Sequence, residues 1–139
     1  MADVVYEIRD WERHYTVAQN RRGENRRPLP WVAMRTRFDG KGYRRVMRMP
    51  NSMELIGAWM LIVEVAAQCP THGRLEDADG PMTAIDLADK TMGDATVFER
   101  ALQVFASKEV AWLDCRELAP RSERGAPTRR DETVRNDTG

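Results

Sequence analysis

The fold that this sequence predicts is decided by residues 72–113, HGRLEDADGPMTAIDLADKTMGDATVFERALQVFASKEVAWL. Residues 73–75 are short and extended, and the Asp-Gly-Pro at 79–81 is typical of a turn. Two helical segments follow, separated by Gly93, a small residue often found in the turn of a helix-turn-helix unit. Residues 110–113 have the pattern of a returning strand. This order of elements predicts a winged helix-turn-helix domain.

The two helices of this stretch carry clear start signals. Thr83 with Asp86 has the spacing of a capping box, and Asp94 is a good N-cap for the second helix. The first helix is expected to present Ile85, Leu87 and Ala88 to the core. The core stripe of the second helix consists of Val97, Phe98, Ala101, Leu102 and Phe105.

A very apolar segment, NSMELIGAWMLIVEVAAQC, precedes this stretch and has little polar face. It predicts a central core helix that begins after Asn51, with Glu54 as the acid of a capping box, and that Pro70 ends. The expected fold class is therefore α+β, mainly helical: a winged helix-turn-helix with an added N-terminal strand and arm.

Three regions are expected along the chain. Residues 1–50 form a basic, arginine-rich N-terminal arm with short strands, VVYEI and WVAMRTRF, a loop at NRRGENRRP, and one or two helical turns at YRRVMRM. Residues 51–118 form the winged-helix core. Residues 119–139 have almost no apolar content and are expected to be a disordered charged tail.

The formal net charge is zero, but the charges are unevenly distributed. Residues 1–50 hold twelve Arg or Lys against six Asp or Glu, whereas residues 51–119 hold five against twelve. Such an asymmetry favours either a basic face that binds a polyanion or two halves that neutralise each other on contact. A solvated basic surface without a ligand is the third interpretation.

The basic residues of the first region are the candidate phosphate contacts, because they are clustered and interleaved with Trp31, Phe38 and Tyr43. They are Arg21, Arg22, Arg26, Arg27, Arg35, Arg37, Lys41, Arg44 and Arg45, and Arg48 follows them. The alternative is that several of these arginines pair with acidic helices of the same chain or of a partner. Weaker candidates for base reading lie on the outer face of the last helix, and they are Thr96, Arg100, Gln103 and Ser107.

Other classes of protein are not favoured. The sequence lacks a phosphate-binding P-loop, a nucleophile elbow and a zinc-protease motif, so a non-enzymatic protein without a cofactor is expected. Cys69 and His72 have a C-x-x-H spacing that His14 and Cys115 could complete, but no second paired motif supports a metal, and two reduced, buried thiols are expected instead.

The N-terminus has no signal-peptide pattern, and the longest apolar run, residues 55–67, is interrupted by Glu64 and is too short to span a bilayer. A soluble, cytoplasmic protein of a bacterial host cell, without a membrane or small-molecule partner, is expected.

Several short segments of the sequence, taken in order, resemble those of a known family. They are Asp10-Trp11-Glu12-Arg13-His14, Trp31-Val32, Gly57-Ala58-Trp59, Gly73-Arg74-Leu75, Asp86-Leu87-Ala88, Phe98-Glu99-Arg100-Ala101-Leu102 and Trp112-Leu113. The chain is similar in this order to the N-terminal winged-helix domain of phage and prophage replication proteins, of the replisome-organiser, DnaD-like type. The resemblance implies a DNA-associated domain that is able to self-associate through its N-terminal elements.

The resulting functional hypothesis is a phage-derived DNA-binding protein that acts in replication initiation or its control, with DNA, a second copy of itself or a replication protein as partners. The last helix, which begins after Asp94, is not basic, and the sequence ends where the family would continue into a helicase-recruiting C-terminal domain, so a free-standing DNA-binding or accessory subunit is expected rather than a loader. The alternative is a protein–protein adaptor that keeps the winged-helix shape without binding DNA.

Overall fold

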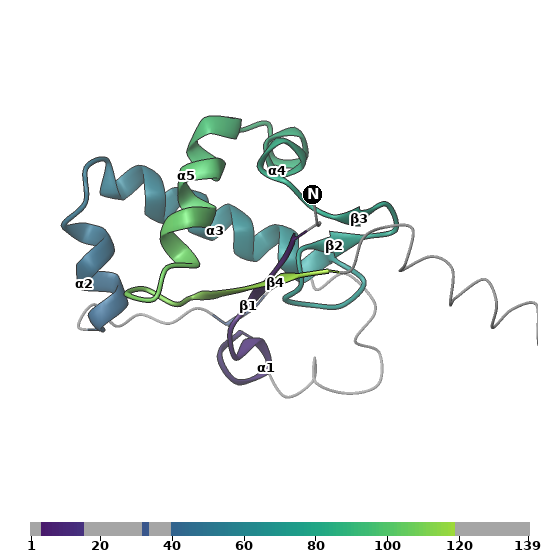
Figure 1. Ribbon diagram of the computed structural model, residues 1–139, viewed down its shortest axis with the longest axis horizontal. Coiled ribbons are helices and arrows are strands. Elements are labelled where there is room, and N and C mark those ends of the chain that lie inside the picture. Colours follow the sequence, from purple (N-terminus) through teal and green to yellow (C-terminus); the bar gives the residue numbers. More distant parts are fainter. Residues whose placement is uncertain (1–3, 16–31, 34–39, 119–139) are drawn as a thin grey trace, which may run out of the picture.

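The computed structural model describes residues 4–15, 32–33 and 40–118 (Figure 1). Its elements are β1 (Val4–Ile8), α1 (Trp11–His14), α2 (Lys41–Met47), α3 (Ser52–Gln68), β2 (Glu76–Asp77), β3 (Gly80–Pro81), α4 (Ala84–Thr91), α5 (Ala95–Phe105) and β4 (Leu113–Glu117). The strands form two antiparallel pairs, β1 with β4 and β2 with β3. A mixed α+β chain that is mainly helical is thus confirmed.

The central helix is α3, as its apolar sequence predicts. Leu55 and Ile62, seven positions apart, are both fully buried, because residues at this spacing lie on one face of a helix. Its N-terminus differs from the expectation. Asn51 has a left-handed backbone (φ 55°), and its side chain does not cap the helix. A capping side chain needs an extended backbone at the N-cap position, so the predicted box with Glu54 is wrong.

The α4–α5 pair begins as the sequence predicts. The Thr83 hydroxyl accepts a hydrogen bond from the Asp86 amide, and the Asp86 carboxylate accepts one from the Thr83 amide, which completes the capping box. Asp94 accepts from the amides of Thr96 and Val97 at the start of α5. Ile85 is an exception, because its side chain is 64% exposed rather than part of the core stripe.

The N-cap role of Asp94 at the start of α5 can be tested directly by substitution. Asp94→Ala removes the acceptor for two amides at the first turn of α5, so we expect the free energy of unfolding to fall by about 1 kcal/mol. Asp94→Asn keeps an acceptor oxygen and is the matched control, with a loss well below that of alanine. Urea denaturation followed by circular dichroism measures both, and equal losses would contradict a capping role.

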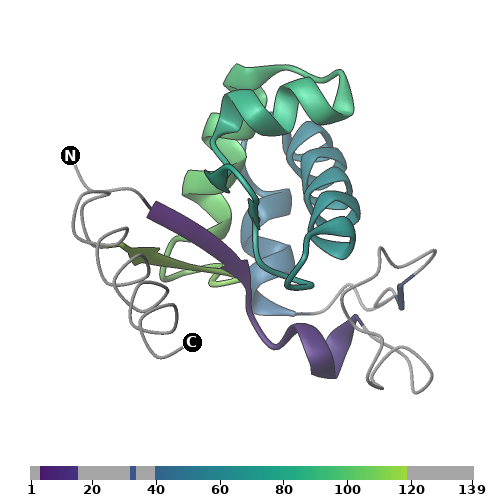
Figure 2. The ribbon, with the colours of Figure 1, turned by 90° about the vertical axis from the view of Figure 1, so that its right-hand side faces the viewer.

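The first and last strands of the described chain lie side by side. Val4 to Ile8 pair antiparallel with Glu117 to Leu113, and the other edge of β1 contacts residues 73–75 through an isolated bridge between Glu7 and Arg74. Figure 2 shows α3, α4 and α5 on one side of this β1–β4 pair. The N-terminal strand is therefore the middle strand of a small three-part sheet.

The returning strand starts later than the sequence predicts. Ala111 has a left-handed backbone (φ 56°), and the Trp112 amide donates to the Phe105 carbonyl. These residues therefore belong to the turn after α5, and β4 begins only at Leu113. Leu113 is buried and the other four residues of β4 are exposed.

The core is built where α3, α5 and the start of β4 meet. Phe98 and Phe105 are its largest fully buried side chains. The rings of Trp59, Phe105 and Trp112 lie within 5.0–5.2 Å of one another, and Phe105 stacks on Trp112 with an interplanar angle of 9°. Within the described residues, no helix has the length and apolar character needed to cross a membrane.

Candidate nucleic-acid interface

Helix α2 approaches the core with a face made of small and apolar residues. Val46 is fully buried, and a Cβ atom on Gly42 would lie only 2.6 Å from Trp112 Nε1. Since residues four apart lie on the same face of a helix, Gly42 and Val46 fix which side of α2 faces inward. Glycine is required at position 42 by this close approach.

The opposite side of α2 carries a cluster of cations that we name the basic stripe. Lys41, Arg44, Arg45 and Arg48 are spaced at i, i+3, i+4 and i+7, and all four are exposed. That spacing places them on one face within an arc of about 100°. The first turn of α2 has no acidic residue, and none of the ion pairs found among the described residues involves these four side chains.

Of the predicted phosphate contacts, Lys41, Arg44 and Arg45 are therefore brought together on one helix face. The spacing adds Arg48 to them, and this regular spacing was the signal in the sequence that could have identified the stripe. The other six candidates, Arg21, Arg22, Arg26, Arg27, Arg35 and Arg37, lie outside the described residues.

The four candidate base readers on α5 differ in their surroundings. Thr96 and Gln103 are exposed. The Ser107 hydroxyl donates to the Val104 carbonyl at 2.6 Å, so its proton is directed at the helix backbone. The Arg100 Nη2 atom donates to the Pro50 carbonyl at 2.6 Å. A guanidinium has further N–H donors, so reading of a base by Arg100 stays a prediction.

The Arg100 contact has a structural consequence for the interface. Pro50 lies in the turn between α2 and α3, so the hydrogen bond ties α5 to that turn. The basic stripe is carried by α2, which packs against α3 (Figure 1).

The surface of α4 has the opposite character. Asp86 and Asp89 are exposed there, and Glu99 adds a third carboxylate on α5. The side chains of Ile85 and Met92 are 64% and 93% exposed beside these acids. Lys90 is exposed on α4 as well, so this surface carries charges of both signs, and it presents apolar side chains to solvent.

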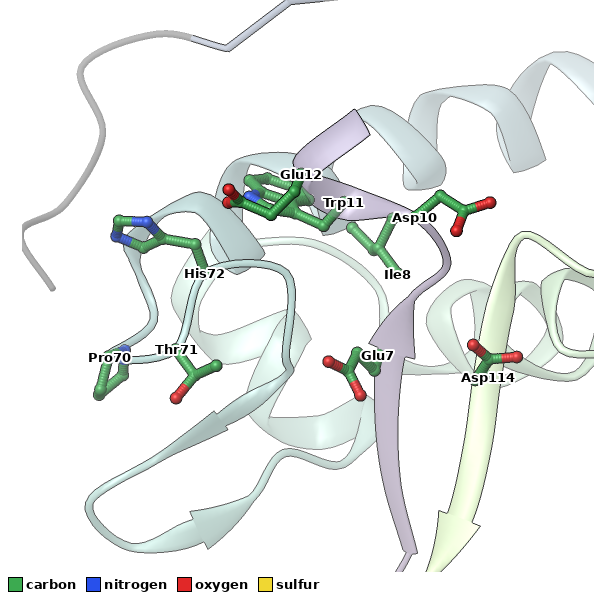
Figure 3. A pocket seen from close by; sticks show the side chains of 9 residues that line it. All are labelled: Glu7, Ile8, Asp10, Trp11, Glu12, Pro70, Thr71, His72 and Asp114. Atoms are coloured by element: carbon green, nitrogen blue, oxygen red, sulfur yellow. The ribbon is translucent and has the colours of Figure 1, made fainter. Parts of the chain in front are cut away.

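A hollow next to α1 is lined by several acidic side chains, among them Glu7, Glu12 and Asp114, together with His72 (Figure 3). Asp114 is engaged by Arg9, whose Nη2 atom lies 2.6 Å from its Oδ1 atom. The carboxylates of Glu7, Glu12 and Asp114 do not converge on a common point in Figure 3.

The predicted pair of buried thiols is half correct. Cys69 is buried, and its thiol donates to the Val65 carbonyl at 3.3 Å. Cys115 is exposed, because β4 places it on an open strand rather than in the core. In the part of the chain that the structure describes, no three His, Cys, Asp or Glu side chains lie close enough to hold a metal ion.

Comparison with known proteins gave no match: no family model, curated protein or solved structure is significantly similar to this chain. The resemblance to phage replication proteins therefore stays a prediction, and the function has to be argued from the surface described above.

Proposed function

We propose that the protein is a non-enzymatic winged helix-turn-helix domain that binds DNA, with the basic stripe of α2 as its main phosphate contact. The fold proposal is supported by α4 and α5, which are joined by the short turn Met92, Gly93 and Asp94 typical of helix-turn-helix units. Further support comes from β4, which returns from α5, and from β1, which lies where the second strand of a wing would pair with it.

The observation that carries the DNA proposal is the exposure of four cations on one face of a helix whose other face packs against the core. Cations held at a fixed spacing neutralise phosphates and release condensed counterions, which gives an affinity that depends strongly on salt. Thr96 and Gln103 on α5 are exposed and are proposed to supply base contacts. A role in phage replication rests on the sequence resemblance alone.

The test is a fluorescence-anisotropy titration of labelled double- and single-stranded DNA across a series of salt concentrations. For Arg44→Ala/Arg45→Ala we expect the slope of log K against log salt to become less steep by about 1.8, since each phosphate contact contributes about 0.9. Lys90→Ala removes an exposed cation from α4 and is the control, with its slope unchanged. Absence of binding by the wild-type chain at low salt would refute the proposal.

A second function is favoured by the surface of α4. Ile85 and Met92 are strongly exposed beside Asp86 and Asp89, a combination suited to a basic, partly apolar protein partner. The alternative is thus an adaptor that docks a protein on α4 and does not bind DNA. For this adaptor we expect Ile85→Ser/Met92→Ser to abolish capture of a basic partner protein and the wild-type chain to show no DNA binding at low salt; DNA binding that falls with salt would contradict it.

A further inference from the structure

The outer edge of β4 is the strongest candidate for a further interaction, and it is distinct from the basic stripe. Among the described strands, none pairs with that edge. Asp114, Cys115, Arg116 and Glu117 are all exposed. An exposed edge presents unpaired backbone N–H and C=O groups, which form a template for another strand.

The register shows which residues of β4 direct their backbone N–H and C=O groups towards β1 and which direct them towards the outer edge. The Arg9 amide donates to the Trp112 carbonyl at 3.0 Å, and this pair continues the β1–β4 register by one step. Hydrogen-bonded and non-hydrogen-bonded pairs alternate in an antiparallel ladder. The backbone groups of Asp114 and Arg116 therefore face β1, and those of Cys115 face the outer edge.

The opposite edge of β1 gives an independent check of this phase. The Tyr6 carbonyl accepts from the Leu75 amide at 2.8 Å, and the Ile8 amide donates to the Gly73 carbonyl at 2.7 Å. Tyr6 and Ile8 thus bond away from β4. In the register, Tyr6 is opposite Cys115 and Ile8 is opposite Leu113. Because these are non-hydrogen-bonded pairs, the backbone N–H and C=O groups of Cys115 and Leu113 point away from β1, towards the outer edge of β4.

From this phase and from the charges we infer that two copies of the chain associate through β4, antiparallel, with Cys115 of one copy opposite Cys115 of the other. This register makes Cys115 a hydrogen-bonded pair with its own counterpart. Each Asp114 then lies opposite an Arg116 of the second copy in a non-hydrogen-bonded pair, where side chains approach most closely. Two-fold registers centred on Asp114 or Arg116 would instead place like charges opposite each other, which is destabilising.

The charges already present in each copy extend this arrangement. Asp114 is bound by Arg9 of its own chain, and Arg116 lies 3.6 Å from Glu7. Four side chains would then form a row of alternating charge across the interface. Arg9 and Asp114 belong to one copy, and Arg116 and Glu7 belong to the second copy. A network of alternating charges is more effective than an isolated surface pair. The association goes beyond the proposed DNA binding and does not depend on it.

The first experiment measures the mass of the full chain by light scattering, without DNA, over a range of concentrations. We expect a rise from 16.0 kDa towards twice that value. In the proposed dimer, position 114 of each copy faces position 116 of the other. Asp114→Arg alone and Arg116→Asp alone therefore each place like charges opposite each other twice, and each should raise the dissociation constant about tenfold or more. An equal mixture of the two variants restores opposite charges at both positions across the two-fold axis, so it should form a heterodimer that is tighter than the homodimer of either variant.

The mixture controls for folding, because the same two variant chains are compared alone and together. A wild-type chain that stays monomeric at every concentration, variants that dimerise like the wild type, or a mixture that stays monomeric would each overturn the inference.

A second measurement does not require the charge variants to fold. Hydrogen-bonded pairs place their Cα atoms about 5.5 Å apart, within the range that a disulfide spans. Oxidation with a copper–phenanthroline complex should therefore give a covalent dimer with Cys69→Ala but not with Cys115→Ala. Burial raises the pKa of the Cys69 thiol, which further limits its reaction. If the folded Cys69→Ala protein gave no more covalent dimer than the same protein when denatured, the register centred on Cys115 would be contradicted.

Discussion

Phe105→Ala is expected to lower the free energy of unfolding by about 3–5 kcal/mol, the usual cost of truncating a fully buried phenylalanine. Phe105 has no exposed surface and contacts both Trp59 and Trp112 at ring-centroid distances of 5.0 and 5.2 Å. A loss of this size is a large part of the roughly 5–15 kcal/mol that stabilises a typical domain, so partial unfolding at 37 °C is expected as well.

The control for this prediction is Phe105→Leu, which keeps most of the buried volume but removes the stacked ring. It should cost clearly less than alanine, because the remaining cavity is smaller. The near-ultraviolet circular dichroism of the Trp59–Trp112 cluster should weaken in both variants. A loss below about 1 kcal/mol for Phe105→Ala would show that the three rings do not form the centre of the core.

Gly73→Ala is expected to destabilise the fold by about 3 kcal/mol through two separate effects. Gly73 has a φ of 89°, a conformation in which a side chain is strained. A Cβ atom there would also lie 2.7 Å from the Cβ and Cγ atoms of Trp11. Because Trp11 is buried and overpacking displaces backbone, β1 would be pushed away from its partner segment.

Gly80→Ala is the matched control, because Gly80 has a φ of 115° but no atom lies within 4 Å of the position that a Cβ atom would take there. It should show the backbone strain alone, about 1–2 kcal/mol. In a Trp11→Ala background, which removes the Cγ atom and the ring but keeps Cβ, the cost of Gly73→Ala should fall part of the way towards that of Gly80→Ala, which is the coupling expected of two residues in contact. Guanidinium denaturation measures the cycle, and additive losses would contradict the clash with Trp11.

Features encoded by neighbouring residues were predictable from the sequence. The capping box of Thr83 and Asp86 and the cap at Asp94 depend on side chains within three positions of the helix start. The buried stripe of α5 follows from helical spacing, and Phe98, Ala101, Leu102 and Phe105 are all buried. In each case, the physical interaction is local, so a single sequence contains the information.

Features that depend on distant residues were not predictable. The left-handed backbone at Asn51 accompanies the turn that Arg100 holds from α5. The start of β4 at Leu113 depends on pairing with β1, in which Leu113 lies opposite Ile8. The same distinction between local and distant information applies to the candidate interface. The spacing of the four cations can be read from α2 alone, whereas the direction in which they point depends on Gly42 packing against Trp112.

The pairing of β1 with β4 also constrains how the chain can fold during synthesis. Val4 leaves the ribosome early, but its partner Glu117 is made more than a hundred residues later. Contacts that join such distant residues form late, because a long loop has to close first. During translation, the residues of β1 therefore lack their β4 partner until Glu117 has been made. A nascent chain stalled before Leu113 should expose this strand to chaperones or to proteases.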